Sequence, residues 1–202
     1  GRVEMSNISF EDRVVIVTGA GNGLGKAYAL ELGNRGAKVV VNDLGGSVDG
    51  SGSASSPADE VANEIIENGG EAVANYDSVA TKEGGESIVQ SAIDNFGTVD
   101  AVINNAGILR DKSFANMSEE ELSLIIDVHL KGTFFVSQPA FKVMKEKNYG
   151  RIVNVASPSG LFGNFGQSNY GAAKMGIVGL TNVLAIEGAK YNIKVNVIAP
   201  TA

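Results

Sequence analysis

Tyr170 and Lys174 form the pair of residues whose types and spacing most directly indicate chemistry. They stand four positions apart in the Ala- and Gly-rich segment 169–179, which predicts a helix with both side chains on one face. A phenol has an ordinary pKa of about 10 and is a poor base at neutral pH, but a neighbouring ammonium favours the phenolate. The pair could therefore accept and return a proton. The same spacing also arises by chance on amphipathic helices.

Ser157 is the next candidate, because it follows the β-branched run 152–155. Open α/β sheets bind ligands at the carboxyl ends of their strands. The Ser157 hydroxyl could hold a substrate oxygen and stabilise a developing alkoxide while Tyr170 transfers the proton. Ser159 is a competing candidate, and either serine could instead satisfy backbone groups in the turn around Pro158.

A glycine-rich run, TGAGNGLG at 18–25, follows the first predicted strand and opens into a helix expected from about Lys26. Gly19 allows a tight turn, Gly23 lets backbone amides approach a pyrophosphate, and Gly25 permits close packing of the helix on the sheet. A helix N-terminus also favours an anion. Any tight connection between a strand and a helix uses glycine, so the run alone is weak evidence. The dinucleotide-binding residues expected here are Gly19, Asn22, Gly23, Leu24 and Gly25.

Asp43 stands at the tip of the second predicted strand, eighteen residues beyond Gly25. A carboxylate there can accept hydrogen bonds from both hydroxyls of an adenosine ribose. It would repel a 2′-phosphate, and no arginine adjoins it, so the position predicts NAD rather than NADP. The alternative is an aspartate that only caps the loop before Gly45 and Gly46.

The elements that must position these residues follow an alternating pattern. Short β-branched runs separated by helical stretches predict a parallel sheet with helices on both faces. The six predicted strands are 14–17, 39–42, 72–75, 101–103, 152–155 and 195–198. At 202 residues, we expect one α/β domain with a doubly wound parallel sheet, the Rossmann fold.

Helices and loops are also predicted by local signals. Ser118 and Glu121 form a capping box at the start of a helix expected over 119–135. The Gly/Ser-rich stretch 45–57 is expected to be a surface loop before a helix at 58–68.

At the two ends, residues 1–5 are interpreted as a cloning remnant with an initiator Met5, and 6–202 as the domain. The chain stops directly after the sixth strand, so we expect a C-terminal strand and a covering lid to be absent.

Composition excludes several classes of function. A net charge of −7 argues against nucleic acid as a partner. No apolar run approaches the length of a membrane span, so we expect no membrane partner. Because the chain has no cysteine and only one histidine, His129, we expect no metal site. We predict a cytoplasmic location, with a peroxisome as the alternative in a eukaryote.

Taken together, these motifs resemble the classical short-chain dehydrogenases/reductases over essentially the whole chain. The resemblance depends on TGAGNGLG at 18–25, NNAG at 104–107, Ser157 and YGAAK at 170–174. A finer resemblance is to the (3R)-hydroxyacyl-CoA dehydrogenase domains of peroxisomal multifunctional enzymes type 2 and their bacterial single-domain relatives. The segments that indicate it are VVVNDLGG at 39–46, VANYDSV at 73–79, NNAGILRDKSF at 104–114, VHLKGTF at 128–134 and GNFGQSNYGAAK at 163–174.

The resemblance implies further site residues. Asp77, Ser78 and Val79 would lie at the adenine, Asn105 near the ribose, and Lys174 between the nicotinamide ribose and Tyr170. Pro200, in the NVIAP segment, is also expected at the cofactor. As alternatives, Asn104 and Asn105 could tie adjacent strands together, and Asp77 could be a turn former.

His129 departs from the classical pattern, which has an asparagine at this position. The asparagine that holds the usual proton relay is therefore replaced in this chain. The imidazole could hold a water next to Lys174, which would make it a catalytic residue, or it could be a packing residue. The hydroxyacyl-CoA subgroup shares this histidine.

The activity implied by the resemblance is reversible hydride transfer between NAD and a (3R)-3-hydroxyacyl-CoA, giving the 3-ketoacyl-CoA. Tyr170 would be the acid/base, and Ser157 would bind the substrate oxygen. Segment 160–168 would line the acyl channel. Alternatives are a 3-ketoacyl-carrier-protein reductase, a steroid or other alcohol dehydrogenase, and a dinucleotide-binding module without turnover. Helices 119–135 and 169–188 resemble those through which the family forms dimers, so a homodimer or homotetramer is expected.

Overall fold

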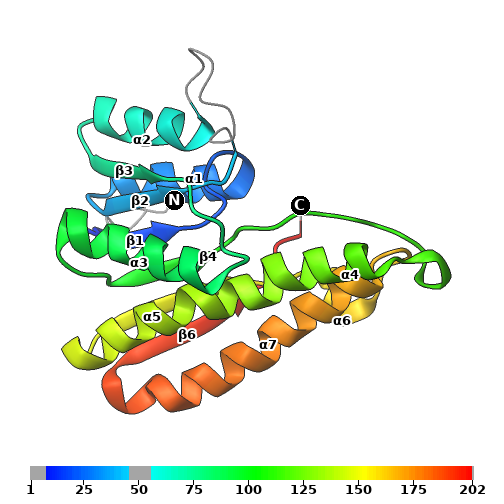
Figure 1. Ribbon diagram of the computed structural model, residues 1–202. Helices are drawn as coiled ribbons and strands as arrows, with labels where there is room; N and C mark the ends of the chain where they lie inside the picture. The colour runs from blue at the N-terminus through cyan, green and yellow to red at the C-terminus, as the bar shows by residue number, and fades with distance from the viewer. Residues whose placement is uncertain (1–7, 46–55, 202) are drawn as a thin grey trace, which may run out of the picture.

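A computed structural model describes residues 8–45 and 56–201 of the chain. Its centre is one sheet of six parallel strands in the order β3-β2-β1-β4-β5-β6 (Figure 1). The strands are β1 (Val14–Val17), β2 (Lys38–Asn42), β3 (Glu71–Asn75), β4 (Ala101–Asn104), β5 (Gly150–Val155) and β6 (Ile193–Ile198). The order reverses between β1 and β4, as in a doubly wound fold, so the predicted Rossmann fold is confirmed. Each predicted strand lies within two residues of an observed one.

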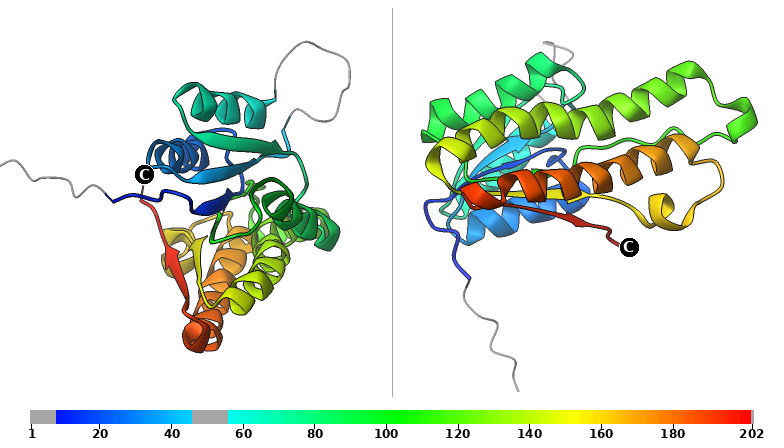
Figure 2. Two further views of the ribbon diagram at one scale, coloured as in Figure 1. Left: turned by 90° about the vertical axis from the view of Figure 1, so that its left-hand side faces the viewer. Right: turned by 90° about the horizontal axis from the view of Figure 1, so that it is seen from below.

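Helices cover the sheet in two layers (Figures 1 and 2). Helices α1 and α2 lie on one face, and α3, α5 and α7 lie on the other. The helices are α1 (Gly23–Asn34), α2 (Pro57–Glu67), α3 (Lys82–Phe96), α4 (Glu119–Ile125), α5 (Gly132–Lys147), α6 (Pro158–Phe162) and α7 (Ser168–Gly188). This arrangement leaves the carboxyl ends of the strands, where polar residues follow β1, β2, β4 and β5, as one continuous edge.

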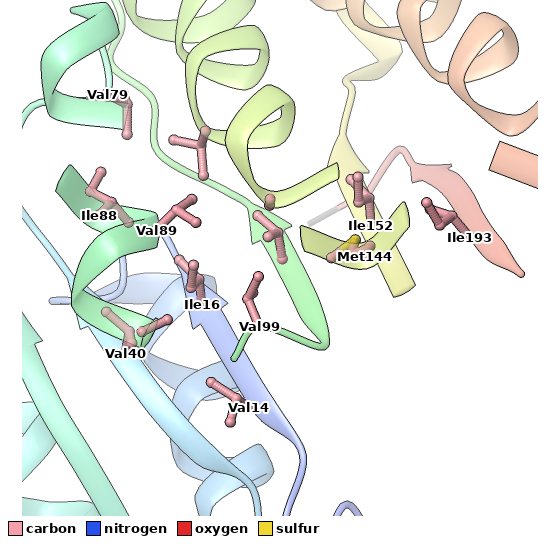
Figure 3. Close-up of a cluster of buried hydrophobic side chains, with 14 of the residues drawn as sticks. Val14, Ile16, Val40, Val79, Ile88, Val89, Val99, Met144, Ile152 and Ile193 are labelled. Carbon is pink, nitrogen blue, oxygen red and sulfur yellow. The ribbon is translucent and has the colours of Figure 1, made fainter. Parts of the chain in front are cut away.

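Successive side chains of each strand point to opposite faces of the sheet and so contribute to two hydrophobic cores, one on each face. In β1, Val14 and Ile16 pack toward α3 and α5, while Val15 and Val17 pack toward α1 and α2. Figure 3 shows the first of these cores, with Ile16 close to Val99 and with Met144 beside Ile152. Because every strand residue of β1 is buried, the sheet centre is rigidly held beneath the site residues.

Two helix predictions need correction. The helix after the glycine run begins at Gly23, three residues before the expected Lys26, so the glycines form its first turn. The helix expected over 119–135 begins at Glu119 behind the predicted Ser118 capping box, but it continues to Lys147 and contains a π-helical turn at Ile126–Lys131. The Thr133 hydroxyl donates to the carbonyl of His129 (2.8 Å) directly after this turn. Hydrophobic spacing does not register such a local change in winding.

Some predictions fall on residues that are not described. Residues 1–5 lie outside the described ranges, as does most of the loop expected at 45–57. No helix within residues 8–45 and 56–201 is long and apolar enough to cross a membrane.

Candidate active site

A cavity of about 300 Å³ opens at the carboxyl edge of the sheet, beside β4 and β5. It is lined by Leu24, Asn105, Gly107, Ile108, Leu109, His129, Val155, Ala156, Ser157, Tyr170, Lys174 and Pro200. All four residues predicted as catalytic line it, together with three predicted cofactor residues, Leu24, Asn105 and Pro200. Residues from six separate stretches of the chain therefore converge on one space.

Lys174 lies at the floor of this cavity and is 4% exposed. Its ammonium donates to the carbonyl of Val155 at the end of β5 (2.8 Å) and lies 5.5 Å from the centre of the Tyr170 ring. Burial lowers the pKa of Lys174 to about 8. Helix α7 thus brings Tyr170 and Lys174 onto one face, as their spacing predicted, and holds the ammonium beside the phenol.

His129 packs against the other side of this pair. It is 3% exposed, and its ring meets the Tyr170 ring edge to face, with centroids 5.1 Å apart. Its Nε2 lies 2.7 Å from the carbonyl oxygen of Ile108. Burial, and then the positive charge of Lys174, lower the pKa of His129 to about 4, so the imidazole is neutral at pH 7.

Ser157 is the N-cap of the short helix α6, where its hydroxyl accepts from the backbone N–H of Ser159 (3.2 Å). It lines the cavity, whereas Ser159 is not among the lining residues. The capping interaction uses one lone pair of Oγ and leaves its O–H free to donate. Residues 160–168 do not line the cavity; they continue beyond Ser157 through α6 and the following loop.

The glycine run forms the predicted tight turn between β1 and α1. Gly19 has φ +61°, and a Cβ there would lie 2.7 Å from Cα of Ala106. A Cβ on Gly25 would lie 2.2 Å from the carbonyl oxygen of Gly19 and 2.5 Å from Nδ2 of Asn105. Gly25 therefore makes room for the turn and for Asn105, rather than for packing of the helix on the strands as predicted.

The two asparagines at the end of β4 have different roles. Asn104 ties strands and helices together, because its Nδ2 donates to Asn154 (2.9 Å) and to Ser137 (2.9 Å). Asn105 instead donates to the carbonyl of Gly19 (3.2 Å) and lines the cavity. The structural alternative is confirmed for Asn104, while Asn105 holds the glycine turn at the edge of the site.

Asp43 and Asp77 lie outside the cavity, at the ends of β2 and β3. The Asp43 carboxylate accepts from the backbone N–H groups of Gly21 (2.9 Å) and Gly45 (2.9 Å). Asp77 is part of a local network in which its carboxylate accepts from Asn75 (2.9 Å). The structure therefore does not bring these residues to Tyr170. Asp43 and Asp77 lie along the same edge of the sheet, as do Asn22, Ser78 and Val79.

Backbone groups are the functional contacts that sequence reasoning missed. The carbonyls of Val155 and Ile108 fix Lys174 and His129. The Thr18 hydroxyl accepts from the N–H groups of Asn105 and Ala106 (both 3.0 Å) and joins β1 to the segment after β4. Main-chain carbonyls have no signature in the sequence. Thr18 belongs to the glycine motif, where its position beside a strand end was the only available signal.

Comparison with known proteins agrees with this site. The sequence profile described as "short chain dehydrogenase" matches residues 13–202. The peroxisomal hydratase-dehydrogenase-epimerase of Saccharomyces cerevisiae is 62% identical over 97% of this chain, and peroxisomal multifunctional enzyme type 2 of Mus musculus is 58% identical over 98%. This chain spans only 22% and 26% of the lengths of these two relatives.

A solved structure extends the comparison to the fold. A short-chain dehydrogenase from Mycobacterium avium has a TM-score of 0.90 and 47% sequence identity, covering 95% of this chain and 68% of that one. The predicted resemblance to short-chain dehydrogenases and to peroxisomal multifunctional enzymes is confirmed. The chain belongs to the short-chain dehydrogenase family, whose members are oxidoreductases acting on hydroxyl groups.

Proposed function

We propose that the chain interconverts a (3R)-3-hydroxyacyl-CoA and its 3-ketoacyl-CoA with NAD as the hydride carrier, and that Tyr170 is the acid/base. The observation that carries the proposal is the buried Lys174 ammonium beside Tyr170, in a cavity that also contains Ser157. An ammonium in such surroundings favours the phenolate more strongly than it would in water.

The residues present fit a nicotinamide dinucleotide. Four helices, α2, α3, α4 and α6, have side-chain caps, which are Ser56, Thr81, Ser118 and Ser157. Helix α1 has no side-chain cap hydrogen bond at Asn22, so its first amides remain available for a pyrophosphate. Asp43 would accept the ribose hydroxyls, with Asp77, Ser78 and Val79 at the adenine end and Asn105, Lys174 and Pro200 at the nicotinamide end.

A proton transfer follows from the positions of these side chains. The bound cofactor would accept the hydride from the alcohol carbon and would return it in the reverse direction. Ser157 donates a hydrogen bond to the substrate oxygen, and Tyr170 removes the hydroxyl proton as a phenolate. Lys174 stabilises that phenolate and binds the nicotinamide ribose.

An acyl-CoA substrate is supported by the relatives and by the surface beyond Ser157. Relatives whose names include hydratase-dehydrogenase-epimerase are more than half identical to this chain. In α6 and the loop after it, Phe162 is 86% exposed and Phe165 is 88% exposed. Apolar side chains this exposed fit an acyl chain lying along segment 160–168. The peroxisomal names of these relatives also support a peroxisomal location over a cytoplasmic one.

Tyr170→Phe tests the mechanism directly. It removes the proton-carrying oxygen and keeps the ring that packs on His129. Turnover of (3R)-3-hydroxyacyl-CoA should fall by at least about a thousandfold, while NADH affinity stays within about threefold. Stopped-flow hydride transfer and NADH fluorescence titration measure the two quantities. Undiminished turnover would contradict the proposed role of Tyr170.

A matched set of substrates distinguishes the rival activities. The parent enzyme is assayed with (3R)- and (3S)-3-hydroxyacyl-CoA, the corresponding acyl-carrier-protein thioesters and a hydroxysteroid, each with NAD and NADP. We expect turnover with the (3R)-acyl-CoA and NAD. Preference for carrier-protein thioesters or for a steroid would replace the substrate assignment, and NADH binding with no turnover of any substrate would indicate a binding module.

We also propose that the chain forms a homodimer or homotetramer through α5 and α7. A groove of about 640 Å³ between these helices includes Phe134, 48% exposed, and Val183, 52% exposed. Exposed apolar side chains on one face fit a second copy of the chain. Sedimentation equilibrium should give a dimer or tetramer, and Val183→Glu should lower the association. A monomeric parent chain would contradict the proposal.

A further inference from the structure

The segment LRDKSF at 109–114 belongs to one of the motifs that indicated the family, but the proton transfer does not use it. It lies in the stretch between β4 and α4. Figures 1 and 2 show this stretch running out past the carboxyl ends of the strands to the end of the molecule where α6 lies. Leu109 lines the active-site cavity, and the five residues after it lead away from the cavity. The segment is therefore a surface that begins at the cavity and extends outward.

The backbone of this segment is fixed, although most of its side chains are exposed. The N–H of Lys112 donates to the carbonyl of Gly166 (2.8 Å) in the loop before α7. The carbonyl of Arg110 accepts from Nδ2 of Asn169 in the first turn of α7 (3.0 Å). These contacts hold the segment against α7, so its exposed side chains have defined starting positions.

Arg110 and Lys112 are exposed cations without a carboxylate partner within residues 8–45 and 56–201. The carboxylate between them, that of Asp111, accepts instead from Nε2 of Gln167 (3.2 Å). Two like charges two residues apart repel each other, and an anion bound to both would remove that repulsion. The pair is therefore suited to an anionic ligand.

Two other lysines at the carboxyl edge of the sheet are paired with carboxylates. Lys26 of α1 lies 3.8 Å from Glu64, and Lys82 of α3 lies 3.8 Å from Glu86. The chain as a whole has a net charge of −7 and repels anions. The positive charge on segment 109–114 therefore distinguishes the surface beside the cavity from the rest of that edge.

Phe114 adds an exposed aromatic ring at the outer end of the segment. It begins the short 3₁₀ turn η1 (Phe114–Asn116) and is 83% exposed. Because an extended chain spans at most about 3.5 Å per residue, its Cα atom lies within roughly 7 Å of that of Lys112. An exposed aromatic face beside positive charge is an arrangement on which proteins stack nucleotide bases while they bind the phosphates.

Coenzyme A has the complementary groups in the matching order. Its pantetheine arm separates the thioester from a pyrophosphate, which is followed by a 3′-phosphorylated adenosine. With the reacting carbon in the cavity, the phosphates would lie outside it. The Cα atom of Lys112 lies within roughly 11 Å of that of Leu109, and the lysine side chain extends further. The order of cavity, cations and aromatic ring along the segment follows the order of thioester, phosphates and adenine along the ligand.

We propose that segment 109–114 binds the 3′-phospho-ADP group of the acyl-CoA, with Arg110 and Lys112 on the phosphates and Phe114 stacked on the adenine. The acyl chain, which we place along segment 160–168, leaves the cavity past Ser157, so the two ends of the substrate follow different segments. The proposal rests on the proposed function, because it assigns how the nucleotide end of that substrate is held.

Substrates that differ only at the nucleotide end test the two cations. The parent enzyme and Arg110→Ala/Lys112→Ala are assayed with a (3R)-3-hydroxyacyl-CoA and with the same acyl group on pantetheine, which has no phosphate. The double variant should lower kcat/KM for the CoA thioester at least about tenfold, mainly through KM, because charge-assisted hydrogen bonds to phosphate are lost. Its kcat/KM for the pantetheine thioester should equal that of the parent. An equal loss with both substrates would overturn the proposal.

A matched control removes the same charge elsewhere. Lys82→Ala/Lys194→Ala changes two exposed lysines, of which Lys194 lies in β6 near the amino end of the strand. This variant should match the parent with both substrates. A loss with the CoA thioester as large as that of Arg110→Ala/Lys112→Ala would assign the effect to net charge and would also overturn the proposal.

Phe114 is tested by removing its ring and by replacing it with another ring. Phe114→Ala should raise KM for the CoA thioester at least about fivefold, because base stacking is lost, and should leave turnover of the pantetheine thioester unchanged. Phe114→Trp, which keeps a planar ring, should hold KM within about twofold of the parent. A loss of kcat/KM with the pantetheine thioester in Phe114→Ala would contradict the assignment of this ring to the adenine.

Calorimetric titration of free CoA into the protein saturated with NADH measures the site without turnover. The NADH prevents CoA from occupying the dinucleotide site. The parent should bind CoA, and Arg110→Ala/Lys112→Ala should weaken this binding at least about tenfold. If it does so while the parent turns over no hydroxyacyl-CoA, the proposed function fails and the nucleotide site stands. If the parent is active but both proteins bind CoA equally, the nucleotide site is overturned and the proposed function stands.

Discussion

The two halves of the carboxyl edge of the sheet present different parts of the chain to their ligands. At the ends of β1 and β2, the available groups are mainly backbone amides of the glycine turn and of α1, with Asp43 as the principal side chain. At the ends of β4 and β5, they are side chains, and the two most deeply placed, Lys174 and His129, are 4% and 3% exposed. We call the first of these the cofactor half and the second the catalytic half, after the roles proposed for them above. The cofactor half depends on close approach of backbone groups, and the catalytic half on burial of ionisable side chains.

This difference determines how each half should fail. In the cofactor half there is no room for a side chain at Gly25, because a Cβ there would lie 2.2 Å from the Gly19 carbonyl oxygen. In the catalytic half, the lowered pKa values of Lys174 and His129 depend on surroundings that exclude water. Substitution should therefore damage the first half by steric conflict, and a change of pH should affect the second.

Buried amides support both halves in the same way. Asn42 of β2 donates to Asn75 of β3 (2.9 Å), and Asn104 of β4 donates to Asn154 of β5 (2.9 Å). Asn154 continues the second link by donating to Thr181 of α7 (3.0 Å). Both halves are thus supported by the same kind of buried hydrogen bond between adjacent strands. They differ in the groups that reach the edge of the sheet, which are backbone amides in one half and buried ionisable side chains in the other.

The largest effect is expected for Gly25→Ala in the cofactor half. The added methyl group must displace the Gly19 carbonyl or Asn105, so NADH binding should weaken at least about a hundredfold, roughly 3 kcal/mol. Lys26→Ala is the matched control, because it changes the next residue of α1, whose ammonium is exposed and 3.8 Å from Glu64. Fluorescence titration measures both, and unimpaired binding by Gly25→Ala would remove the steric account of this half.

Sequence reasoning was more successful in the cofactor half for a physical reason. Its determinants are local: β-branched runs predicted the strands within two residues, and the glycine spacing predicted the turn. In the catalytic half, the residue types of Tyr170, Lys174 and Ser157 were apparent, but their environments were not. Lys174 is held by a carbonyl 19 residues away and His129 by one 21 residues away. Neither carbonyl, nor the π-helical turn, has a side-chain signature.

A pH effect of intermediate size should appear in the catalytic half. The pKa of His129 is lowered from 6.5 to about 4, so between these values the unfolded chain binds more protons than the folded one. The contribution of His129 to the free energy of unfolding is therefore fully present above pH 6.5. It falls by about 3 kcal/mol as the pH decreases toward 4. Urea unfolding at a series of pH values, compared with His129→Asn, isolates the contribution because carboxylates titrate in both proteins. Parallel curves would contradict burial as the cause of the low pKa.

The smallest effect is expected for Asp43→Asn, which changes charge in the half otherwise built on backbone. The amide keeps one acceptor oxygen for Gly21 or Gly45 but removes the negative charge that a 2′-phosphate would meet. The preference for NADH over NADPH should fall about tenfold, roughly 1.4 kcal/mol, mainly through tighter NADPH binding. Glu146→Gln on α5 is the control for a change in net charge alone, because its side chain is exposed on the opposite layer. Competitive titration measures the preference for NADH over NADPH in both variants. An equal change in both would show that the net charge of the chain, and not Asp43, sets this preference. The cofactor half would then distinguish the two cofactors by shape.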